Sequence, residues 1–329
     1  MSVTCRARAV RYPRVTEDSV ITYVESDLFD SPAQVLVNTV NTVGVMGKGI
    51  ARRFKRAFPE MFCEYQTLCE AGQLTIGRLW LYRGSDRWIL NFPTKKHWRN
   101  PSQPEYIEAG LQRFLEMYSE TGISQIAFPQ LGCGNGELDW ATQVRPLMEK
   151  YLAKLSIDIF VHLYRSVDTP EHRNPAATKR WLRLEVESLA FVEVWDDIIE
   201  IVRKRDGFRT LTDKSFFRVT ISDTGGEGIC FDTDTGQFTI PPESILEFWQ
   251  QLRTYGYVTP GVLDADLEAY FHYLVALFAE LPYVRTVRLG HDPAMLDRPT
   301  ALGLQWAPRV QTKRRAATQE EQVVQLQFA

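Results

Sequence analysis

Two glycine-rich segments constrain the fold of this 329-residue chain more than any other feature. Residues 44–51 (GVMGKGIA) follow the apolar, β-branched run 35–40, and residues 131–136 (LGCGNG) follow the apolar run 125–129. Each segment precedes a pattern typical of a helix, which predicts that each loop connects a strand to a helix. Glycine lets a backbone approach a ligand closely, and the N–H groups at the start of a helix favour an anion. Two such loops at one cleft indicate a site for a diphosphate.

These loops differ from the common nucleotide-binding motifs. A P-loop needs Ser or Thr after its lysine, whereas Gly49 follows Lys48 here. The second loop reads G-x-G-x-G, in contrast to the G-x-G-x-x-G of dinucleotide-binding proteins. The sequence therefore disfavours a standard kinase or dehydrogenase.

A third segment, residues 91–99 (NFPTKKHWR), combines cations, an aromatic side chain and an ionisable lysine after a predicted strand. Cations suit phosphates and an aromatic ring suits a stacked base, so this composition favours contact with DNA. Neighbouring cations favour the neutral amine of a lysine, which is a base or a nucleophile, so Lys95 is a candidate for catalysis. The alternative is a surface loop against which Trp98 packs. The expected DNA contacts are Lys96, His97, Trp98 and Arg99.

Six short motifs occur in order between Val24 and Leu163, and their combination is more specific than any one of them. They are Glu25-Ser26-Asp27-Leu28-Phe29, Asn38-Thr39-Val40-Asn41, Gly47-Lys48-Gly49-Ile50-Ala51, Phe92-Pro93-Thr94-Lys95, Tyr106-Ile107-Glu108-x-Gly110-Leu111 and Pro129-x-Leu131-Gly132-Cys133-Gly134. In these motifs the chain resembles a macrodomain, the ADP-ribose-binding fold. The subgroup that it is most similar to comprises the bacterial DNA ADP-ribosyl glycohydrolase antitoxins and the eukaryotic terminal ADP-ribose protein glycohydrolase.

The resemblance implies a role for each motif. Asp27 would accept a hydrogen bond from the adenine amino group, although an Asp after a strand is also a common helix or turn cap. Asn41 would contact the distal ribose and assist the catalytic Lys95, whereas Asn38 is expected to be structural. Cys133 is expected to be a small, buried loop residue. The implied ADP-ribose ligands are Asp27, Leu28, Asn41, Gly47, Lys48, Gly49, Ile50, Gly132, Cys133, Gly134, Asn135 and Gly136, with no metal or cofactor.

One position departs from the family pattern. The eukaryotic relative pairs its lysine with an aspartate two residues after the Gly-Cys-Gly turn, where this chain has Gly136. This departure puts in doubt a covalent lysyl intermediate that needs that acid. Glu137 or Asp139 are alternatives for the acid, but the start of a helix also explains both.

The alternation of strand and helix patterns predicts a three-layer α/β/α sandwich with a mixed sheet, because a hairpin interrupts the βα repeat. Strands are expected over residues 21–24, 35–40, 78–82, 87–91, 124–129 and 157–164. Helices are expected over residues 47–58, 61–70, 104–121 and 139–155. The spacing of Ser102 and Glu105 predicts a capping box, the basic face of helix 47–58 is expected to be solvated rather than bound to DNA, and Pro146 should kink or restart the last helix.

Beyond residue 165 the pattern changes and predicts a smaller α+β domain. We expect a lead-in at 1–20, the macrodomain at 21–165, a linker at 166–180, the α+β domain at 181–310 and a mobile tail at 311–329. In this second domain, helices are expected at 181–206, 242–255 and 264–281, and strands at 216–221, 228–232, 237–240 and 284–289. Residues 255–257 (YGY) are a candidate interface patch. In the antitoxins that the chain resembles, the region after the macrodomain holds the toxin.

The composition limits the remaining possibilities. The net charge of -3 means that contact with DNA must come from a local patch, and the five cysteines contain no C-x-x-C pair that would indicate zinc or a disulfide framework. No membrane segment or signal peptide is evident, so a cytoplasmic protein is expected.

The resemblance implies hydrolysis of ADP-ribose from a nucleobase, thymine, in single-stranded DNA, to counteract a DNA ADP-ribosyltransferase toxin. Two alternatives are an ADP-ribose reader without turnover and a hydrolase of ADP-ribosylated protein or O-acetyl-ADP-ribose.

Overall fold

The structure is a computed structural model that describes residues 21–163, 175–183, 186–221, 228–260, 263, 265–289 and 301–306. The chain divides into two compact units, residues 1–178 and 179–329. This division falls inside the segment 166–180 that the sequence predicts as a linker. Helix α5 (Pro175–Leu182) begins within that segment. The predicted lead-in 1–20 and tail 311–329 lie outside the described residues.

The first unit contains a six-stranded sheet in the order β1-β6-β5-β2-β4-β3. All neighbouring strands in it are parallel except β3 and β4, which form the predicted antiparallel hairpin, so the prediction of a mixed sheet is confirmed. The strands are β1 (Ile21–Val24), β2 (Val35–Asn41), β3 (Trp80–Arg83), β4 (Trp88–Lys95), β5 (Gln125–Pro129) and β6 (Asp158–His162).

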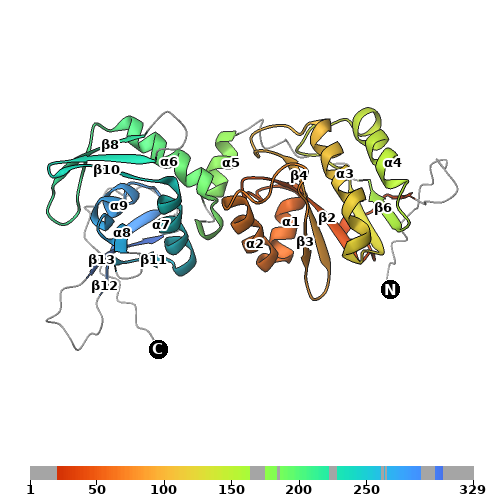
Figure 1. The fold of residues 1–329 in the computed structure, drawn as a ribbon, viewed down its shortest axis with the longest axis horizontal. Coiled ribbons are helices and arrows are strands. Elements are labelled where there is room, and N and C mark those ends of the chain that lie inside the picture. Colours follow the sequence, from red (N-terminus) through yellow and green to blue (C-terminus); the bar gives the residue numbers. More distant parts are fainter. Residues whose placement is uncertain are drawn as a thin grey trace, which may run out of the picture. The chain divides into compact units, whose positions relative to one another are not determined.

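Helices cover both faces of this sheet, which confirms the three-layer α/β/α prediction (Figure 1). Successive residues of β2 face opposite layers, because Val35 and Val37 join one buried cluster and Leu36 joins the other. Helices α1 (Gly49–Ala57) and α2 (Pro59–Glu70) pack on the face of Leu36. Helices α3 (Pro104–Thr121) and α4 (Arg145–Leu152) pack on the face of Val35 and Val37.

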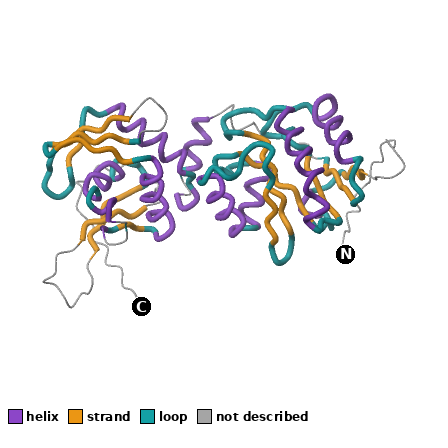
Figure 2. The backbone as a smooth tube through the Cα atoms, viewed as in Figure 1, coloured by secondary structure: helices purple, strands orange, loops and turns teal. Residues whose placement is uncertain are grey.

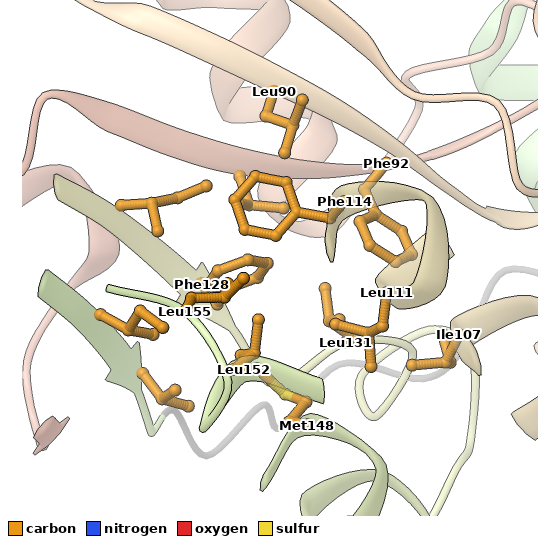
Figure 3. Packing of buried hydrophobic residues seen from close by; sticks show 14 of the residues in the cluster. Leu90, Phe92, Ile107, Leu111, Phe114, Phe128, Leu131, Met148, Leu152 and Leu155 are labelled. Carbon is orange, nitrogen blue, oxygen red and sulfur yellow. The ribbon is translucent and has the colours of Figure 1, made fainter. Parts of the chain in front are cut away.

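The core under α3 shows why one motif glycine is required. Phe92, Leu111, Phe114 and Phe128 pack together there (Figure 3). A Cβ atom at Gly110 would lie 2.2 Å from Cζ of Phe92, so only glycine lets α3 approach the sheet this closely. The helix thereby fixes the β4 backbone that carries Lys95.

Of two local predictions about helix starts, the capping box is wrong, whereas the restart of the last helix at Pro146 is confirmed. Helix α3 begins with Gln103 as its N-cap and has no side-chain cap, so Ser102 does not form a capping box; Pro104, whose missing N–H costs nothing there, opens the helix. The helix predicted over 139–155 is divided into a π-helical turn (Trp140–Val144) and α4, with Pro146 in the first turn of α4. Asp139 caps the π-helical turn by accepting a bond from the Thr142 N–H at 2.7 Å.

The second unit is α+β, as predicted, and contains two antiparallel sheets (Figure 2). One has the order β10-β9-β8-β7 and the other the order β11-β13-β12. The strands are β7 (Phe208–Arg209), β8 (Phe216–Ile221), β9 (Ile229–Thr233), β10 (Gly236–Ile240), β11 (Tyr257–Val258), β12 (Val284–Leu289) and β13 (Ala301–Trp306). The main helices are α6 (Phe191–Lys204), α7 (Pro242–Tyr255), α8 (Ala265–Glu268) and α9 (Phe271–Phe278), so the helices predicted over 181–206 and 264–281 are each interrupted.

A buried ionic cluster fixes the start of this unit. Arg183 donates to both carboxylate oxygens of Asp197, from Nε at 2.7 Å and from Nη2 at 2.5 Å. Glu193 is fully buried with its Oε2 atom 3.5 Å from Nη1 of Arg183, and the Tyr283 hydroxyl donates to Asp197 at 3.0 Å. Two buried carboxylates therefore depend on one guanidinium.

Candidate functional site

A cavity of about 790 Å³ opens at the carboxyl ends of the parallel strands in the first unit. Asp27, Asn41, Lys95, Gln130 and His162 lie in its lining, each at or just beyond the end of a different strand. In open α/β sheets, ligands bind at this edge because the loops that follow the strands meet there. The topology thus collects residues that are far apart in the sequence.

Both glycine loops line this cavity and touch each other. Gly49 starts helix α1 with φ of 57°, and a Cβ atom there would lie 2.8 Å from Nδ2 of Asn135 in the second loop. Helix α1 has no side-chain cap, so its first N–H groups are available to an anion. The predicted pair of loops at one cleft is present.

Gly136 lies where the second glycine loop packs against Ser102. A Cβ atom there would lie 2.2 Å from Oγ of Ser102 and 2.3 Å from the carbonyl oxygen of Gly132. The Ser102 N–H donates to the Gly136 carbonyl at 3.0 Å, and the Ser102 hydroxyl is buried. This backbone has no room for the aspartate that the family pattern implies at this position.

Lys95 is the last residue of β4 and is 6% exposed. The pairing of β2 with β4 is irregular at this point, since Val40 pairs with Pro93 but Asn41 pairs with Lys95. The Lys95 Nζ atom donates to the carbonyl oxygen of Asn135 at 2.6 Å. The amine therefore lies in the cavity wall beside the second glycine loop, on a strand rather than on the expected loop.

Asn41 has a structural role in the first glycine loop. Its Oδ1 accepts bonds from Val43 N at 3.1 Å, Val45 N at 3.3 Å and the Tyr65 hydroxyl at 3.1 Å, while Nδ2 donates to the Val45 carbonyl at 2.6 Å. Its oxygen is thus occupied within the loop, whereas the side-chain amide has a second N–H and Asn41 lines the cavity, so the expected contact with the ribose stays a prediction. Asn38 is buried and donates to Asn91 at 2.9 Å, in line with the structural role expected for it.

Asp27 has the capping role that the sequence left open, and its contact with adenine stays a prediction. Its Oδ1 accepts the Phe29 N–H at 3.0 Å as a cap, and its Oδ2 accepts Nη1 of Arg53 at 2.6 Å at the cavity wall. Burial opposes ionisation of Asp27, but the bonds from Arg53 and Phe29 outweigh it and hold its pKa below the ordinary value. The Arg53 guanidinium also stacks over the Phe29 ring, 4.3 Å from its centroid.

The four predicted DNA contacts differ in accessibility. Lys96 is exposed, and His97 and Arg99 are half-buried. Trp98 is fully buried, with the Arg99 guanidinium 4.7 Å from its ring centroid, so its ring has no face for a base. The prediction of base stacking by Trp98 is therefore wrong, and the alternative, in which Trp98 packs against the protein, is correct.

Two groups of cavity residues were not expected from the sequence. Arg52, Arg53 and Arg56 of α1 lie in the lining, although the basic face of this helix was expected to be merely solvated. His162 lies there too, with Nδ1 3.2 Å from both Oγ and the carbonyl oxygen of Ser26. Burial lowers the pKa of His162, which favours the neutral ring. Nothing in the sequence next to His162 indicates that a histidine at the end of an apolar strand would line the cavity.

Cys133 lies in the lining but has little reactivity. Its Sγ donates to the Leu131 carbonyl at 3.5 Å, and burial raises the pKa of its thiol to about 12. It therefore stays a thiol at neutral pH, in line with its expected loop role. Within the described ranges, no three His, Cys, Asp or Glu side chains gather as a metal site would require, and no helix is long and apolar enough to cross a membrane.

Comparison with known proteins identifies relatives of the first unit. Residues 37–146 match the family model "Macro domain". The DNA ADP-ribosyl glycohydrolase of Thermus aquaticus is 41% identical over 180 residues, which cover 54% of this chain and 49% of the relative. A DNA ADP-ribosyl transferase-DNA ADP-ribosyl glycohydrolase fusion protein of Thermosipho africanus is 40% identical over 162 residues, which cover 44% of this chain and 42% of the relative.

A solved structure, the macrodomain of Thermus aquaticus DarG, is 46% identical and aligns with a TM-score of 0.42 over 44% of this chain and 98% of that one. The chain spans about half the length, or less, of the two curated relatives named above.

Proposed function

This chain carries, in its N-terminal half, a macrodomain homologous to those of DNA ADP-ribosyl glycohydrolases, and on that premise we propose that it releases ADP-ribose from a nucleobase in single-stranded DNA. Water adds to the anomeric carbon of the distal ribose, and the base leaves with its nitrogen protonated. The products are free ADP-ribose and the restored base, for which we propose thymine.

The observation that carries this proposal is the buried amine of Lys95 beside the second glycine loop. In our assignment the adenine lies against Asp27 and the diphosphate lies between the N-terminus of α1 and residues 132–136. The distal ribose then extends towards Lys95. Each of the three chemical groups of ADP-ribose is thus matched to a part of the cavity that suits it.

Cleavage of a glycosidic bond passes through an oxocarbenium-like state. A diphosphate held rigidly near that sugar stabilises its positive charge, and burial strengthens this interaction because little water screens it. Lys95 then acts on the attacking water, on the anomeric carbon or on the departing base. The crowding at Gly136 argues against any covalent intermediate that requires a carboxylate at that position.

The strand on either side of the modified base is proposed to pass over the exposed Lys96 and the half-buried Arg99. These side chains contribute attraction to phosphates without reading a base. Single-stranded DNA is the favoured substrate because no base pair must be opened before the modified nucleotide enters the cavity.

A DNA ADP-ribosyltransferase toxin is the proposed partner of this chain in a toxin–antitoxin system of the cytoplasm. The support is the Thermosipho africanus relative, whose name records a transferase and a glycohydrolase in one chain. We propose that the second unit, predicted at residues 181–310, holds that toxin. Co-expression of the toxin with the full chain tests this assignment, and co-purification that persists in a Lys95→Ala variant supports binding outside the cavity.

The test of the activity uses an oligonucleotide that carries one ADP-ribosylated thymine. Lys95→Ala should lower the rate of ADP-ribose release by about 10²–10⁴-fold, the usual contribution of a positioned acid or base, while calorimetry shows little change in affinity for free ADP-ribose. Lys96→Ala is the matched control, because it removes the adjacent but exposed amine and should weaken binding of the oligonucleotide without abolishing release.

Three results would contradict the proposal. Retention of most of the wild-type rate by Lys95→Ala would remove the lysine from the chemistry. Stoichiometric binding of modified DNA without product would make the protein a reader of ADP-ribose. Release from ester-linked ADP-ribosylated protein or O-acetyl-ADP-ribose, with no activity on DNA, would assign a different substrate class.

A further inference from the structure

The four-stranded sheet of the second unit has one buried face and one solvent face. Along β8 the side chains alternate strictly, since Phe217 and Val219 are buried while Phe216, Arg218 and Thr220 are exposed. The strand register continues the solvent face through Cys230, Asp232, Gln237 and Thr239, and across to Arg209. This solvent face is polar apart from Cys230 and one large aromatic ring.

That ring belongs to Phe216, which is 44% exposed. Among the described residues only Tyr255 is also a large hydrophobic side chain with this degree of exposure. A Cβ atom at Gly207 would lie 2.3 Å from Cζ of Phe216, so the ring rests directly on the Gly207 backbone. One edge of the ring therefore packs on the Gly207 backbone, while solvent reaches much of the rest.

Two guanidinium groups flank the Phe216 ring. The Cζ atoms of Arg209, its cross-strand neighbour, and of Arg218, two residues along β8, each lie 5.7 Å from the ring centroid. Arg209 also donates to the Lys214 carbonyl at 3.0 Å, which brings the exposed Lys214 close to the same edge. The ring thus lies next to two guanidinium groups, of which Arg209 is held by a hydrogen bond.

Two carboxylates accompany these cations. Asp232 lies opposite Arg218 in the strand register, and Asp213 accepts bonds from Ser215, at 2.8 Å from its hydroxyl, and from Thr210. The bonds to Asp213 occupy its oxygens. Asp206, next to Gly207, and Asp234, in the turn between β9 and β10, also lie at this end of the sheet, so the cationic feature of the site is the pair of guanidiniums at the ring and not a net positive charge.

We propose that Arg209, Phe216 and Arg218 form a binding site for unmodified single-stranded nucleic acid, separate from the macrodomain cavity. One base displaces the guanidiniums from over the exposed Phe216 ring and stacks there, and the phosphates on either side of that base bind the two guanidiniums. A flat exposed ring between cations suits this ligand because every base has a π-face and every nucleotide has a charge. An acidic peptide would use the arginines alone and would give no reason for an exposed ring between them.

This site goes beyond the proposed glycohydrolase activity, since it recognises neither ADP-ribose nor a modified base. Its effect would be to hold a strand to the protein between encounters with the cavity, which raises the local concentration of substrate without a new contact at the site of reaction.

The experiment measures binding of a labelled, unmodified oligothymidine to the full chain in saturating free ADP-ribose, which fills the macrodomain cavity. Phe216→Ala should weaken binding by about 5- to 150-fold, the effect of losing one stacked base. Arg209→Ala with Arg218→Ala should lower the slope of log affinity against log salt by about 1.4, since each single-strand phosphate contact contributes about 0.7. Tyr255→Ala, the matched exposed aromatic, should change neither quantity.

Phe216→Leu and Phe216→Trp guard against a folding defect, because both keep an apolar side chain over Gly207. The leucine variant should bind as weakly as the alanine variant, and the tryptophan variant should bind at least as well as wild type. Turnover of ADP-ribosylated thymidine should stay at the wild-type rate in all Phe216 variants, and Lys95→Ala should keep oligothymidine binding. Loss of the cavity activity and loss of this site are thus separable.

The inference is overturned if wild type does not bind oligothymidine, or if Phe216→Ala binds it as tightly as Tyr255→Ala does. It is also overturned if polyglutamate of equal charge displaces the oligonucleotide as effectively as unlabelled oligothymidine, because charge alone would then explain the binding.

Discussion

Substitution of Gly136 by alanine should destabilise the macrodomain, and the size of the effect follows from three contacts. The new Cβ atom would lie 2.2 Å from Oγ and 2.8 Å from Cβ of Ser102, and 2.3 Å from the Gly132 carbonyl oxygen. A hydroxyl can rotate away, but the Gly132 carbonyl is held by the Leu138 N–H at 3.1 Å. Overpacking of this kind costs about 1–3 kcal/mol, and the fixed carbonyl favours the upper end.

A loss of about 3 kcal/mol corresponds to a fall in Tm of roughly 6–12 °C, since each kcal/mol shifts a domain of this size by about 2–4 °C. The displaced loop also carries Asn135, whose carbonyl holds Lys95. We therefore expect weaker binding of ADP-ribose, by about 10-fold for each 1.4 kcal/mol lost from the interaction with the loop.

Calorimetry on the full chain measures both effects. The unfolding transition that shifts upward on addition of ADP-ribose belongs to the macrodomain. Gly134→Ala is the control in the same loop, because a Cβ atom there meets no other atom within 4 Å. The reasoning is refuted if Gly136→Ala unfolds at the same temperature as Gly134→Ala does.

Three further predictions concern buried polar groups. Tyr65→Phe should lower the free energy of unfolding by about 1–3 kcal/mol, because the buried Asn41 carbonyl loses a bond of 2.8 Å; chemical denaturation measures this. Arg183→Met should cost about 3–5 kcal/mol by the same measurement, since it leaves the charge of Asp197 buried without its partner. Burial lowers the pKa of His162 below 6.5, so the unfolded chain binds more protons than the folded chain below that pH. The free energy of unfolding should therefore fall as the pH drops from 6.5 towards the folded-state pKa, by up to about 1.4 kcal/mol per pH unit. His162→Asn should remove this part of the pH dependence.

Matched controls separate these effects from general damage. Tyr82→Phe removes a more accessible hydroxyl, 3.4 Å from Glu60, and Arg205→Met breaks an ion pair with Glu280 whose side chains are 50% and 31% exposed. Each should change stability by less than about 1 kcal/mol. If these two control variants lost as much unfolding free energy as Tyr65→Phe and Arg183→Met, burial would not determine the loss of stability.

The sequence predicts the parts of the site that depend on local backbone chemistry. Glycine at positions 44–51 and 131–136 after apolar strands predicts both loops, and the order of strands and helices predicts the layers. Trp98 and Ser102 were misjudged because their surroundings come from distant segments: Trp98 is buried by tertiary packing, and Ser102 lies under Gly136, thirty-four positions further along. His162 reaches the cavity only through the pairing of β6 between β1 and β5, which no local pattern encodes.

Under the proposed function, the bond from Lys95 to the Asn135 carbonyl has a consequence for the timing of catalysis. Stripping water from an ammonium group is among the more expensive steps in building an active site, and here it is completed as the chain folds. Every round of reaction then begins with a dehydrated amine already aimed, so substrate has only to exchange one partner for another. A variant with a solvated lysine at this position would have to repeat that dehydration in each cycle, and its rate would be slower by that amount.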